Sequence, residues 1–366
     1  MKNNILGLYI LVIVSLLSGN DLLGNNNRQN PLKAIMEMWF GTNYQKSPDY
    51  MKNIINLKGK PLQIGQLIGD PYSMTCVDTL LIYGDRYGGK SISVFDLKNN
   101  RFVGRFISEG QGPNEVIPML YLIPYSQKDK LYAFQRGMNI INTFDVSNFQ
   151  IQSSIKIASS LPPSYTLRPN RMQKTKDYYV GVGVIDKGRF GIFDSNGKFL
   201  YTDGVYPYQG KDMEPNKAYT LYQGQICASP ERNYFAAGCW WSDHIAFYEV
   251  TKNGVVLLKE YSSYDTTVDF INMIAIKSNS VLNFTEAFGT ADYCYMLFNG
   301  KTFAENNEGT RGGNYIIVFD WQGNYIKTFH IDYKAYCFYV DEANNCIYAS
   351  VLDENLDYVI TKLEMK

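Results

Sequence analysis

The chain has 366 residues, of which 45% are hydrophobic and 15% aromatic, with 30 tyrosines and 20 phenylalanines. Aromatic side chains favour the pleated, half-buried surfaces of sheets over helices, so we expect an all-β protein. Lysine plus arginine and aspartate plus glutamate both number 35. This balance excludes a global field that would draw the protein onto nucleic acid or an anionic membrane, and we expect no nucleic-acid partner.

The first 19 residues are typical of an export signal. Lys2 precedes an apolar run from Ile5 to Leu17, which is shorter than the roughly 20 residues that a bilayer core requires. We therefore predict a signal-peptide-like segment at residues 1–19, with membrane contact confined to it if it is not cleaved. Asn20 stands where a lipoprotein signal would carry its acylated cysteine, so the lipidation pattern is incomplete.

Residues 20–48 are predicted to form a polar linker and a short helix. The stretch from Asn20 to Asn30 is rich in Asn and Gly and cannot bury a core. Apolar side chains then recur at the spacing of one helical face, at Leu32, Ile35, Met36, Trp39 and Phe40. We expect this helix to pack on the flank or end of the following domain; a partner-binding or membrane-surface helix is the alternative.

A hairpin phrase recurs through residues 49–366. An alternating strand ends in an aromatic–acid pair, and a turn rich in Asp, Asn and Gly follows, at Phe95-Asp96, Phe144-Asp145, Phe193-Asp194, Phe319-Asp320 and, in degenerate form, Tyr248-Glu249. The first three copies lie 49 residues apart. A fixed period of this length is typical of a propeller or solenoid.

An apolar strand precedes each hairpin, and a sixth such strand runs from Cys346 to Val351. The segment Tyr358 to Leu363 then reaches the chain end without a final outer strand, and an unpaired sheet edge is a liability. We predict that Asn53 to Leu57 pairs with this edge. Residues 49–366 are therefore expected to form one six-bladed β-propeller of four-stranded antiparallel blades, the last blade closed by an N-terminal strand.

The segment Ser108-Glu109-Gly110-Gln111-Gly112-Pro113-Asn114-Glu115 resembles the G-x-G-P-x-E phrase of NHL-like propellers and of the TolB-like six-bladed propellers of Bacteroidetes. With the export signal and the Phe-Asp hairpins, the chain looks like a member of that TolB-like group. The resemblance implies an exported protein of the periplasm or outer cell surface of a Gram-negative bacterium, with an interaction role and no defined reaction.

The phrase also has a structural explanation. Gly110 and Gly112 can adopt positive φ and Pro113 fixes the exit of the loop, so we expect a tight connection between blades. The alternative is that Glu109 or Glu115 binds a ligand.

Loops that join the second and third strands of propeller blades gather on one face around the central channel. The candidate ligand-binding residues in these loops are Asp85, Arg86, Arg136, Arg189, Trp241, Asp243, His244 and Arg311. Arginine forks and flat aromatic faces suit saccharides or peptide termini, although loops are commonly only solvated. We expect a monomeric, non-enzymatic binding module that recognises a protein, peptide or glycan on this face.

The rival hypothesis is a propeller enzyme, either a glycan lyase or hydrolase or a metal-dependent, lactonase-like hydrolase. It would use Asp243 and His244 as catalytic groups together with Asp85 and Arg86. No phosphate loop, G-x-S-x-G elbow or H-E-x-x-H motif occurs, and no cofactor is expected. Ca²⁺ held in the channel by Asp and Asn oxygens is the alternative.

The six cysteines show no C-x-x-C spacing, which argues against structural zinc. Cys227 and Cys239 fall on strands whose expected register does not place them opposite each other. We predict buried free thiols, although an exported protein could form disulfides.

Overall fold

The computed structural model describes residues 44–45, 47–127, 129–157, 167–206, 215–262, 280–305 and 312–365. The chain divides into two compact units, Met1–Tyr44 and Gln45–Lys366, and β1 (Tyr44–Gln45) spans the division. The signal-like segment at residues 1–19, most of the linker and the helix expected at Leu32–Phe40 lie outside the described residues.

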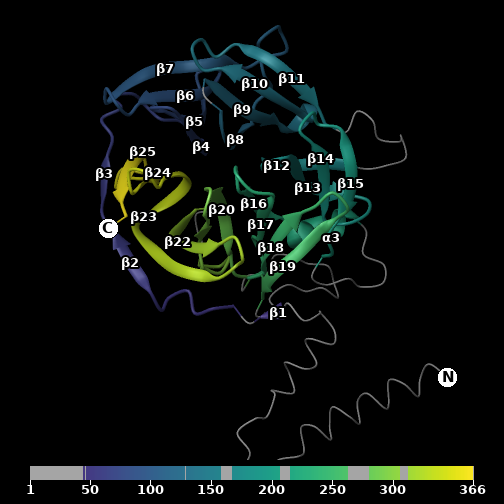
Figure 1. Cartoon of the computed structure of the whole chain (residues 1–366). Coiled ribbons are helices and arrows are strands. Elements are labelled where there is room, and N and C mark those ends of the chain that lie inside the picture. The colour runs from purple at the N-terminus through teal and green to yellow at the C-terminus, as the bar shows by residue number, and fades with distance from the viewer. Residues whose placement is uncertain are drawn as a thin grey trace, which may run out of the picture. The chain divides into compact units, whose positions relative to one another are not determined.

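The second unit is a ring of antiparallel sheets (Figure 1). Blade one comprises β4 (Pro71–Val77), β5 (Leu80–Tyr87), β6 (Lys90–Asp96) and β7 (Arg101–Ser108). Blade two comprises β8 (Leu120–Gln127), β9 (Lys130–Gln135), β10 (Ile140–Asp145) and β11 (Ile151–Lys156), with the 3₁₀ turn η1 (Arg136–Met138) between β9 and β10. Blade three comprises β12 (Leu167–Lys174), β13 (Tyr178–Ile185), β14 (Phe190–Asp194) and β15 (Phe199–Asp203).

Blade four follows the helix α3 (Pro215–Tyr222) and comprises β16 (Gly224–Ala228), β17 (Tyr234–Cys239), β18 (Ile245–Val250) and β19 (Val255–Tyr261). The fifth and sixth blades share one eight-stranded sheet. Blade five comprises β20 (Phe284–Gly289), β21 (Tyr293–Phe298), β22 (Gly313–Asp320) and the first half of β23 (Tyr325–Asp341). The second half of β23 is the innermost strand of blade six, followed by β24 (Cys346–Leu352) and β25 (Tyr358–Glu364).

The ring is closed by the N-terminal side of the propeller, which confirms the expected mode of closure. The closing strand is β3 (Gly59–Pro61), which pairs antiparallel with β25. The assignment of this role to Asn53–Leu57 was wrong: β2 (Ile54–Leu57) instead runs parallel to β23 at the outer edge of blade five. The sequence of Asn53–Leu57 predicts a strand but not whether it pairs with the edge of β25 or with that of β23, because both edges offer unpaired backbone groups.

The repeated Phe-Asp pairs have a clear structural basis. Each Phe lies at a register shift between the third and fourth strands of its blade, for example between Val94 and Phe95, and each is fully buried. Each Asp then caps the following turn: Asp194 Oδ1 accepts hydrogen bonds from the backbone N–H groups of Asn196 and Lys198, both at 2.9 Å. The phrase therefore combines a bulge that twists the blade with a self-capped turn.

The Ser108–Glu115 loop connects blades one and two, as expected, but its glycines serve a different purpose. Neither Gly110 nor Gly112 is among the described residues with positive φ. The carboxylate of Glu115 folds back onto the loop and accepts a hydrogen bond from Gly112 N–H at 2.7 Å. A Cβ at Gly110 would collide with that carboxylate, so the glycine leaves the space that the Glu115 side chain occupies. Glu115 is therefore hydrogen-bonded within its own loop.

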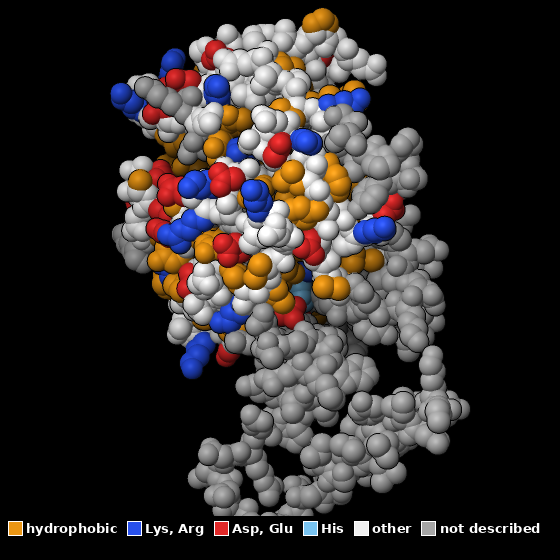
Figure 2. Space-filling model, turned by 45° about the vertical axis from the view of Figure 1, so that its right-hand side comes forward, with side chains coloured by type: hydrophobic (Ala, Val, Ile, Leu, Met, Phe, Trp, Pro, Cys, Tyr) orange, Lys and Arg blue, Asp and Glu red, His pale blue; other side chains and the backbone are white. Residues whose placement is uncertain are grey.

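Apolar faces of adjacent blades pack against each other and form the core, such as the cluster of Phe247, Phe284 and Phe319 between blades four and five. The face shown in Figure 2 has acidic and basic side chains interspersed with small apolar patches, in keeping with the balanced net charge. None of the helices in the described ranges is long and apolar enough to cross a membrane.

Candidate functional site

A cavity of about 230 Å³ lies where blades two, three and four meet the central channel. Its polar and aromatic lining comes from innermost strands, from α3 and from two connections between strands: Tyr121, Arg136, Asn170, Arg171, Tyr219, Gln223 and Trp240. Two arginines face this cavity, and none of the described residues that line it is a carboxylate. We refer to it as the mouth cavity. Such a lining suits an anionic ligand that also offers a flat face.

Arg171 is held in place by contacts from its neighbours. Its guanidinium carbon lies 3.9 Å from the centroid of the Tyr121 ring, and its Nε donates to Gln225 Oε1 at 3.3 Å. Gln225 in turn donates to the backbone oxygen of Thr285 at 2.7 Å. Side chains and backbone from blades two, four and five thus orient a cation that β12 of blade three projects into the channel.

The aromatic side of this arrangement continues into blade one. Tyr72 and Tyr121 meet edge to face with ring centroids 5.6 Å apart, and Arg86 lies over Tyr72 at 5.4 Å. The Tyr72 hydroxyl accepts a hydrogen bond from Leu120 N–H at 3.1 Å, which fixes the ring. Arg86, Tyr72, Tyr121 and Arg171 therefore form one row of contacts from blade one to blade three, with the two tyrosines in the middle.

Glu286 is the acidic counterpart of Arg171 on β20. Burial raises the pKa of this carboxyl to about 7, and the Arg171 guanidinium and the Ala287 N–H partly oppose the rise. The Ala287 N–H donates to Glu286 Oε1 at 3.0 Å. The Glu286 carboxyl, which balances the charge of Arg171, therefore changes its ionisation near neutral pH.

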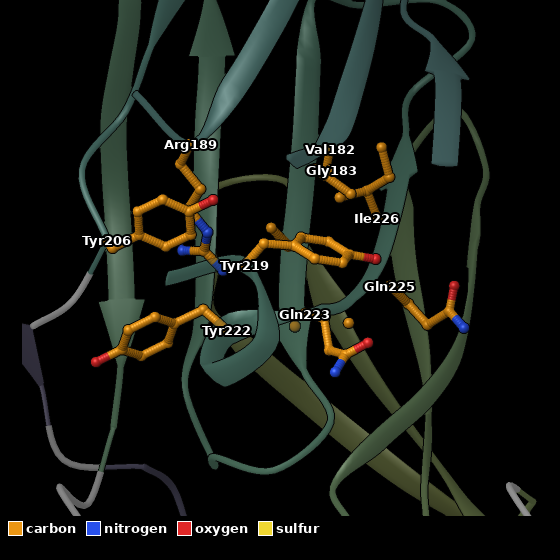
Figure 3. Close-up of a pocket in the computed structure, with 12 residues that line it drawn as sticks. Val182, Gly183, Arg189, Tyr206, Tyr219, Tyr222, Gln223, Gln225 and Ile226 are labelled. Carbon is orange, nitrogen blue, oxygen red and sulfur yellow. The ribbon is translucent and has the colours of Figure 1, made fainter. Parts of the chain in front are cut away.

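Beneath α3 lies a second, small cavity of about 10 Å³, room for one water molecule. It shares Tyr219, Gln223 and Gly224 with the mouth cavity. Figure 3 shows the guanidinium of Arg189 beside the rings of Tyr206 and Tyr222 in this cavity.

Arg189 is only 4% exposed. Its Nη1 donates to the Tyr248 hydroxyl at 3.4 Å and its Nη2 to Cys239 Sγ at 3.5 Å. Within the described ranges, no carboxylate lies within ion-pair distance of it. A buried cation among phenols and a thiol is an unusual arrangement, because desolvated charges are normally paired.

A Cys–His–Glu row adjoins Arg189. Cys239 Sγ lies 3.9 Å from His244 Nδ1, and His244 Nε2 lies 3.2 Å from Glu260 Oε2. Burial raises the pKa of the Cys239 thiol to about 11 and lowers the pKa of His244, so both groups are neutral at pH 7. Cys239 and His244 are 0% and 1% exposed. The row is therefore a buried packing element and does not supply a thiolate nucleophile.

The residues proposed from the sequence are distributed over several parts of the ring. Arg136 lines the mouth cavity and Arg189 the deeper one. Asp85 is 1% exposed and accepts hydrogen bonds from Gly69 N–H and Ser93 Oγ, both at 2.9 Å. Arg86 pairs with Asp70 at 2.8 Å on the surface.

The remaining proposed residues belong mainly to the β17–β18 loop of blade four. Trp241 packs against Phe303, and Asp243 accepts hydrogen bonds from the hydroxyls of Ser47 and Ser262 at 3.0 and 3.2 Å. His244 is buried beside Glu260. Arg311 lies outside the described residues. Asp85 and Arg86 lie in blade one and Asp243 and His244 in blade four, on separate sheets of the ring.

Sequence reasoning missed Tyr121, Asn170, Arg171 and Gln223. All but Gln223 lie on innermost strands, whereas the candidates came from loops. Glu286 stands out in the sequence as the one charge of the largely apolar strand Phe284–Gly289, whereas Arg171 lies in a strand with several other polar side chains and does not stand out. No group of three or more His, Cys, Asp or Glu side chains that could hold a metal occurs in the described part of the chain, so no carboxylate cluster there supports the Ca²⁺ alternative.

The ring of sheets, closed by an N-terminal strand, defines a β-propeller module. Arginine and aromatic side chains of the mouth cavity lie at the entrance to its central channel. The family model of the TolB-like 6-blade propeller-like proteins matches residues 51–343. The chain belongs to this family, which confirms the resemblance seen in its sequence. The search of curated proteins found no match.

Solved structures show the same fold at low sequence identity. A putative exported protein from Bacteroides fragilis is 13% identical, with a TM-score of 0.55, covering 88% of this chain and 98% of its own. A member of the DUF4221 family from Bacteroides vulgatus is also 13% identical, with a TM-score of 0.51 and coverages of 84% and 97%. Regucalcin, a calcium-binding protein from Agrobacterium tumefaciens, is 10% identical, with a TM-score of 0.51 and coverages of 86% and 98%.

Proposed function

We propose that this protein is an exported binding module that recognises an acidic saccharide, one bearing uronic-acid carboxylates, at the mouth cavity. The observation that carries the proposal is that Arg136 and Arg171 line one cavity whose described lining contains no carboxylate. An arginine fork matches a carboxylate in shape and charge, and a buried or half-buried cation gains most from an anionic ligand.

The other side chains of the mouth cavity support a saccharide. Tyr219 and Trp240 supply aromatic surface for sugar rings, while Asn170 and Gln223 offer amide donors and acceptors for hydroxyl groups. An acidic peptide carries the same carboxylate charge as an acidic saccharide, but it lacks sugar rings with their hydroxyl groups. We therefore favour the saccharide and treat an acidic peptide as an outcome of the test.

Export to the periplasm or outer surface is supported by two independent observations. Residues 1–19 have the pattern of a signal segment, and one structure with the same fold is described as a putative exported protein. A glycan-binding role is suited to that location, where polysaccharide is accessible. No observation on the described residues favours the hydrolase alternative.

Isothermal titration calorimetry of the full chain with oligogalacturonate tests the proposal. A neutral maltooligosaccharide of equal length and a Glu-rich peptide serve as the comparison ligands. We expect saturable binding of oligogalacturonate, binding at least ten-fold weaker for the neutral oligomer, and a loss of affinity as salt rises.

Equal binding of the acidic and neutral oligomers would remove the role assigned to the arginines. Binding of the acidic peptide alone would replace the saccharide with a peptide carboxylate at the same cavity. Failure of all three ligands to bind would contradict the proposal.

A further inference from the structure

Two cysteines from neighbouring blades meet in the core. Cys227 of β16 and Cys294 of β21 place their Sγ atoms 3.3 Å apart, and they are 1% and 0% exposed. Both are free thiols in the structure. We propose that Cys227 and Cys294 form a disulfide bond that joins blades four and five when the chain folds in an oxidising environment.

A glycine brings the two strands close enough for this contact. Gly289 is the register partner of Cys294, and a Cβ at Gly289 would collide with the backbone oxygen of Ala228, the residue after Cys227. Because no side chain intervenes, the end of β20 approaches the backbone of β16. The two thiols are thereby placed face to face by the fold itself.

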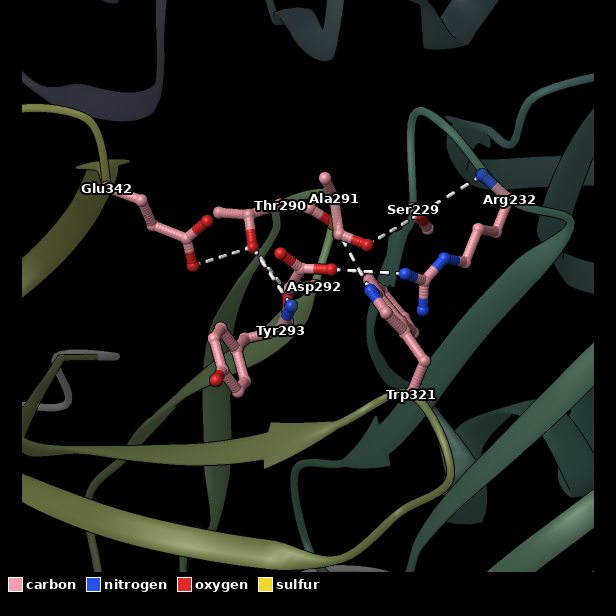
Figure 4. Close-up of polar contacts among 8 residues, drawn as sticks. All are labelled: Ser229, Arg232, Thr290, Ala291, Asp292, Tyr293, Trp321 and Glu342. Carbon is pink, nitrogen blue, oxygen red and sulfur yellow. Dashed lines mark hydrogen bonds and ion pairs between the residues drawn. The ribbon is translucent and has the colours of Figure 1, made fainter.

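Contacts on the next residues hold this approach in place. Ser229 donates to the backbone oxygen of Ala291 at 3.3 Å, and Arg232 pairs with Asp292 at 3.1 Å. Trp321 Nε1 donates to the backbone oxygen of Thr290 at 3.2 Å. Figure 4 shows this network, which ties the turn before Cys294 to the turn after Cys227.

The same turn is held from the opposite side by blade six. Thr290 Oγ1 donates to Glu342 Oε1 at 2.9 Å. The turn is thus bound to blades four and six at once, so the distance between the cysteines does not depend on one contact.

The other cysteine near Cys227 in the sequence does not compete for it. Cys227 is the register partner of Ala236, and Cys239 is that of Gly224. The Cys239 sulfur already interacts with Arg189, the Tyr222 carbonyl and His244. Among the described residues, Cys294 is the cysteine that faces Cys227.

Bond formation requires the sulfur atoms to move about 1.3 Å closer, to the 2.05 Å of a disulfide. Each thiol loses a proton, and two electrons pass to a disulfide oxidant: two protein thiols and one oxidised glutathione give the protein disulfide and two reduced glutathiones. An oxidising compartment, which rests on the proposed export, would supply such an oxidant.

The burial of the two cysteines determines when the disulfide can form. Burial and the neighbouring Cys227 raise the pKa of Cys294 well above its ordinary value, so the folded protein holds almost no thiolate at this position. Thiolate is the attacking species in exchange. The bond should therefore form while the chain folds and should resist reduction afterwards.

The test compares two refolding reactions of the full chain, one in a glutathione buffer rich in the oxidised form and one in dithiothreitol. Digestion without reduction, followed by mass spectrometry, should reveal the Cys227 and Cys294 peptides linked only in the oxidised sample. The folded oxidised protein should have four free thiols on denaturation, against six in the reduced one. Its Tm should be higher by about 5 °C, since the bond closes a loop with a separation of 67 residues.

Cys227→Ser and Cys294→Ser should each remove the linked peptide and the Tm difference. Cys76→Ser, on the partly exposed Cys76 of blade one, is the matched control and should retain both. Circular dichroism verifies that each variant folds; if a serine variant does not, Cys227→Ala replaces it. Recovery of both peptides unlinked from folded, oxidised wild-type protein would overturn the proposal, as would linkage of either cysteine to another partner.

Discussion

Arg171 stacks on Tyr121 with 3.9 Å between its guanidinium carbon and the ring centroid. This contact joins blades two and three at the point where the mouth cavity meets the channel. A cation on an aromatic face keeps its N–H edges available to a second partner, since the ring occupies only its flat side. The contact therefore orients Arg171 for a ligand without consuming its donors.

Arg171→Met should weaken oligogalacturonate binding by at least ten-fold. The substitution keeps the length and packing of the side chain but removes a charge-assisted hydrogen bond worth about 1.5–3 kcal/mol. Calorimetry at constant salt measures the change. Arg232→Met is the matched control, because Arg232 is an exposed arginine in the β16–β17 turn, at the opposite end of its blade from the β17–β18 loop. Similar losses in the two variants would show that only net charge matters.

Glu286→Gln should flatten the dependence of stability on pH. The folded pKa of about 7 lies above the ordinary value of 4.5, so the folded state binds the proton more tightly than the unfolded state. Its contribution is fully present below pH 4.5 and is lost as pH rises through 7, amounting to roughly 3 kcal/mol.

Urea denaturation at pH 5, 6, 7 and 8 measures this effect. Wild-type protein should lose stability across the series relative to Glu286→Gln, and Glu249→Gln on β18 should follow the wild type. Parallel profiles for wild type and Glu286→Gln would contradict the raised pKa.

Arg189→Met should leave the free energy of unfolding unchanged or raise it by about 1 kcal/mol. The guanidinium is desolvated without an ion-pair partner among the described residues, and replacing such a charge with an apolar side chain of similar volume is often neutral or stabilising. Chemical denaturation measures the difference. Arg189→Ala is the comparison and should be less stable because it leaves a cavity. A loss of more than about 2 kcal/mol in Arg189→Met would show that the bonds to Tyr248 and Cys239 outweigh the cost of desolvation.

Gly59→Val should destabilise the closure of the ring by about 1–3 kcal/mol. A Cβ at Gly59 would collide with the side chain of Thr361, and β3 pairs with β25 through only three register partners. Overpacking a short closing strand separates it from its neighbour. Lys60→Thr, at the exposed neighbouring position, is the control and should keep wild-type stability. An unchanged free energy of unfolding in Gly59→Val would mean that β3 contributes little to closure.

Much of the fold was determined by local chemistry that the sequence displays. The Phe-Asp phrase encodes a bulge within a hairpin and a self-capped turn, both formed by residues close in the sequence, so its five copies predicted five blades. The apolar strand Cys346–Val351 predicted the sixth. The edge left by Tyr358–Leu363 likewise predicted closure from the front of the chain.

Only the tertiary structure decided which segment closes the ring and which side chains share a cavity. The sequence indicated a strand at Asn53–Leu57 and none at Gly59–Pro61, and the different partners of β2 and β3 depend on the path of the chain around blade six. Arg171 and Tyr121, or Cys227 and Cys294, are brought together by radial stacking of blades. Such contacts join residues distant in the sequence, and no local propensity or periodicity encodes the distance between them.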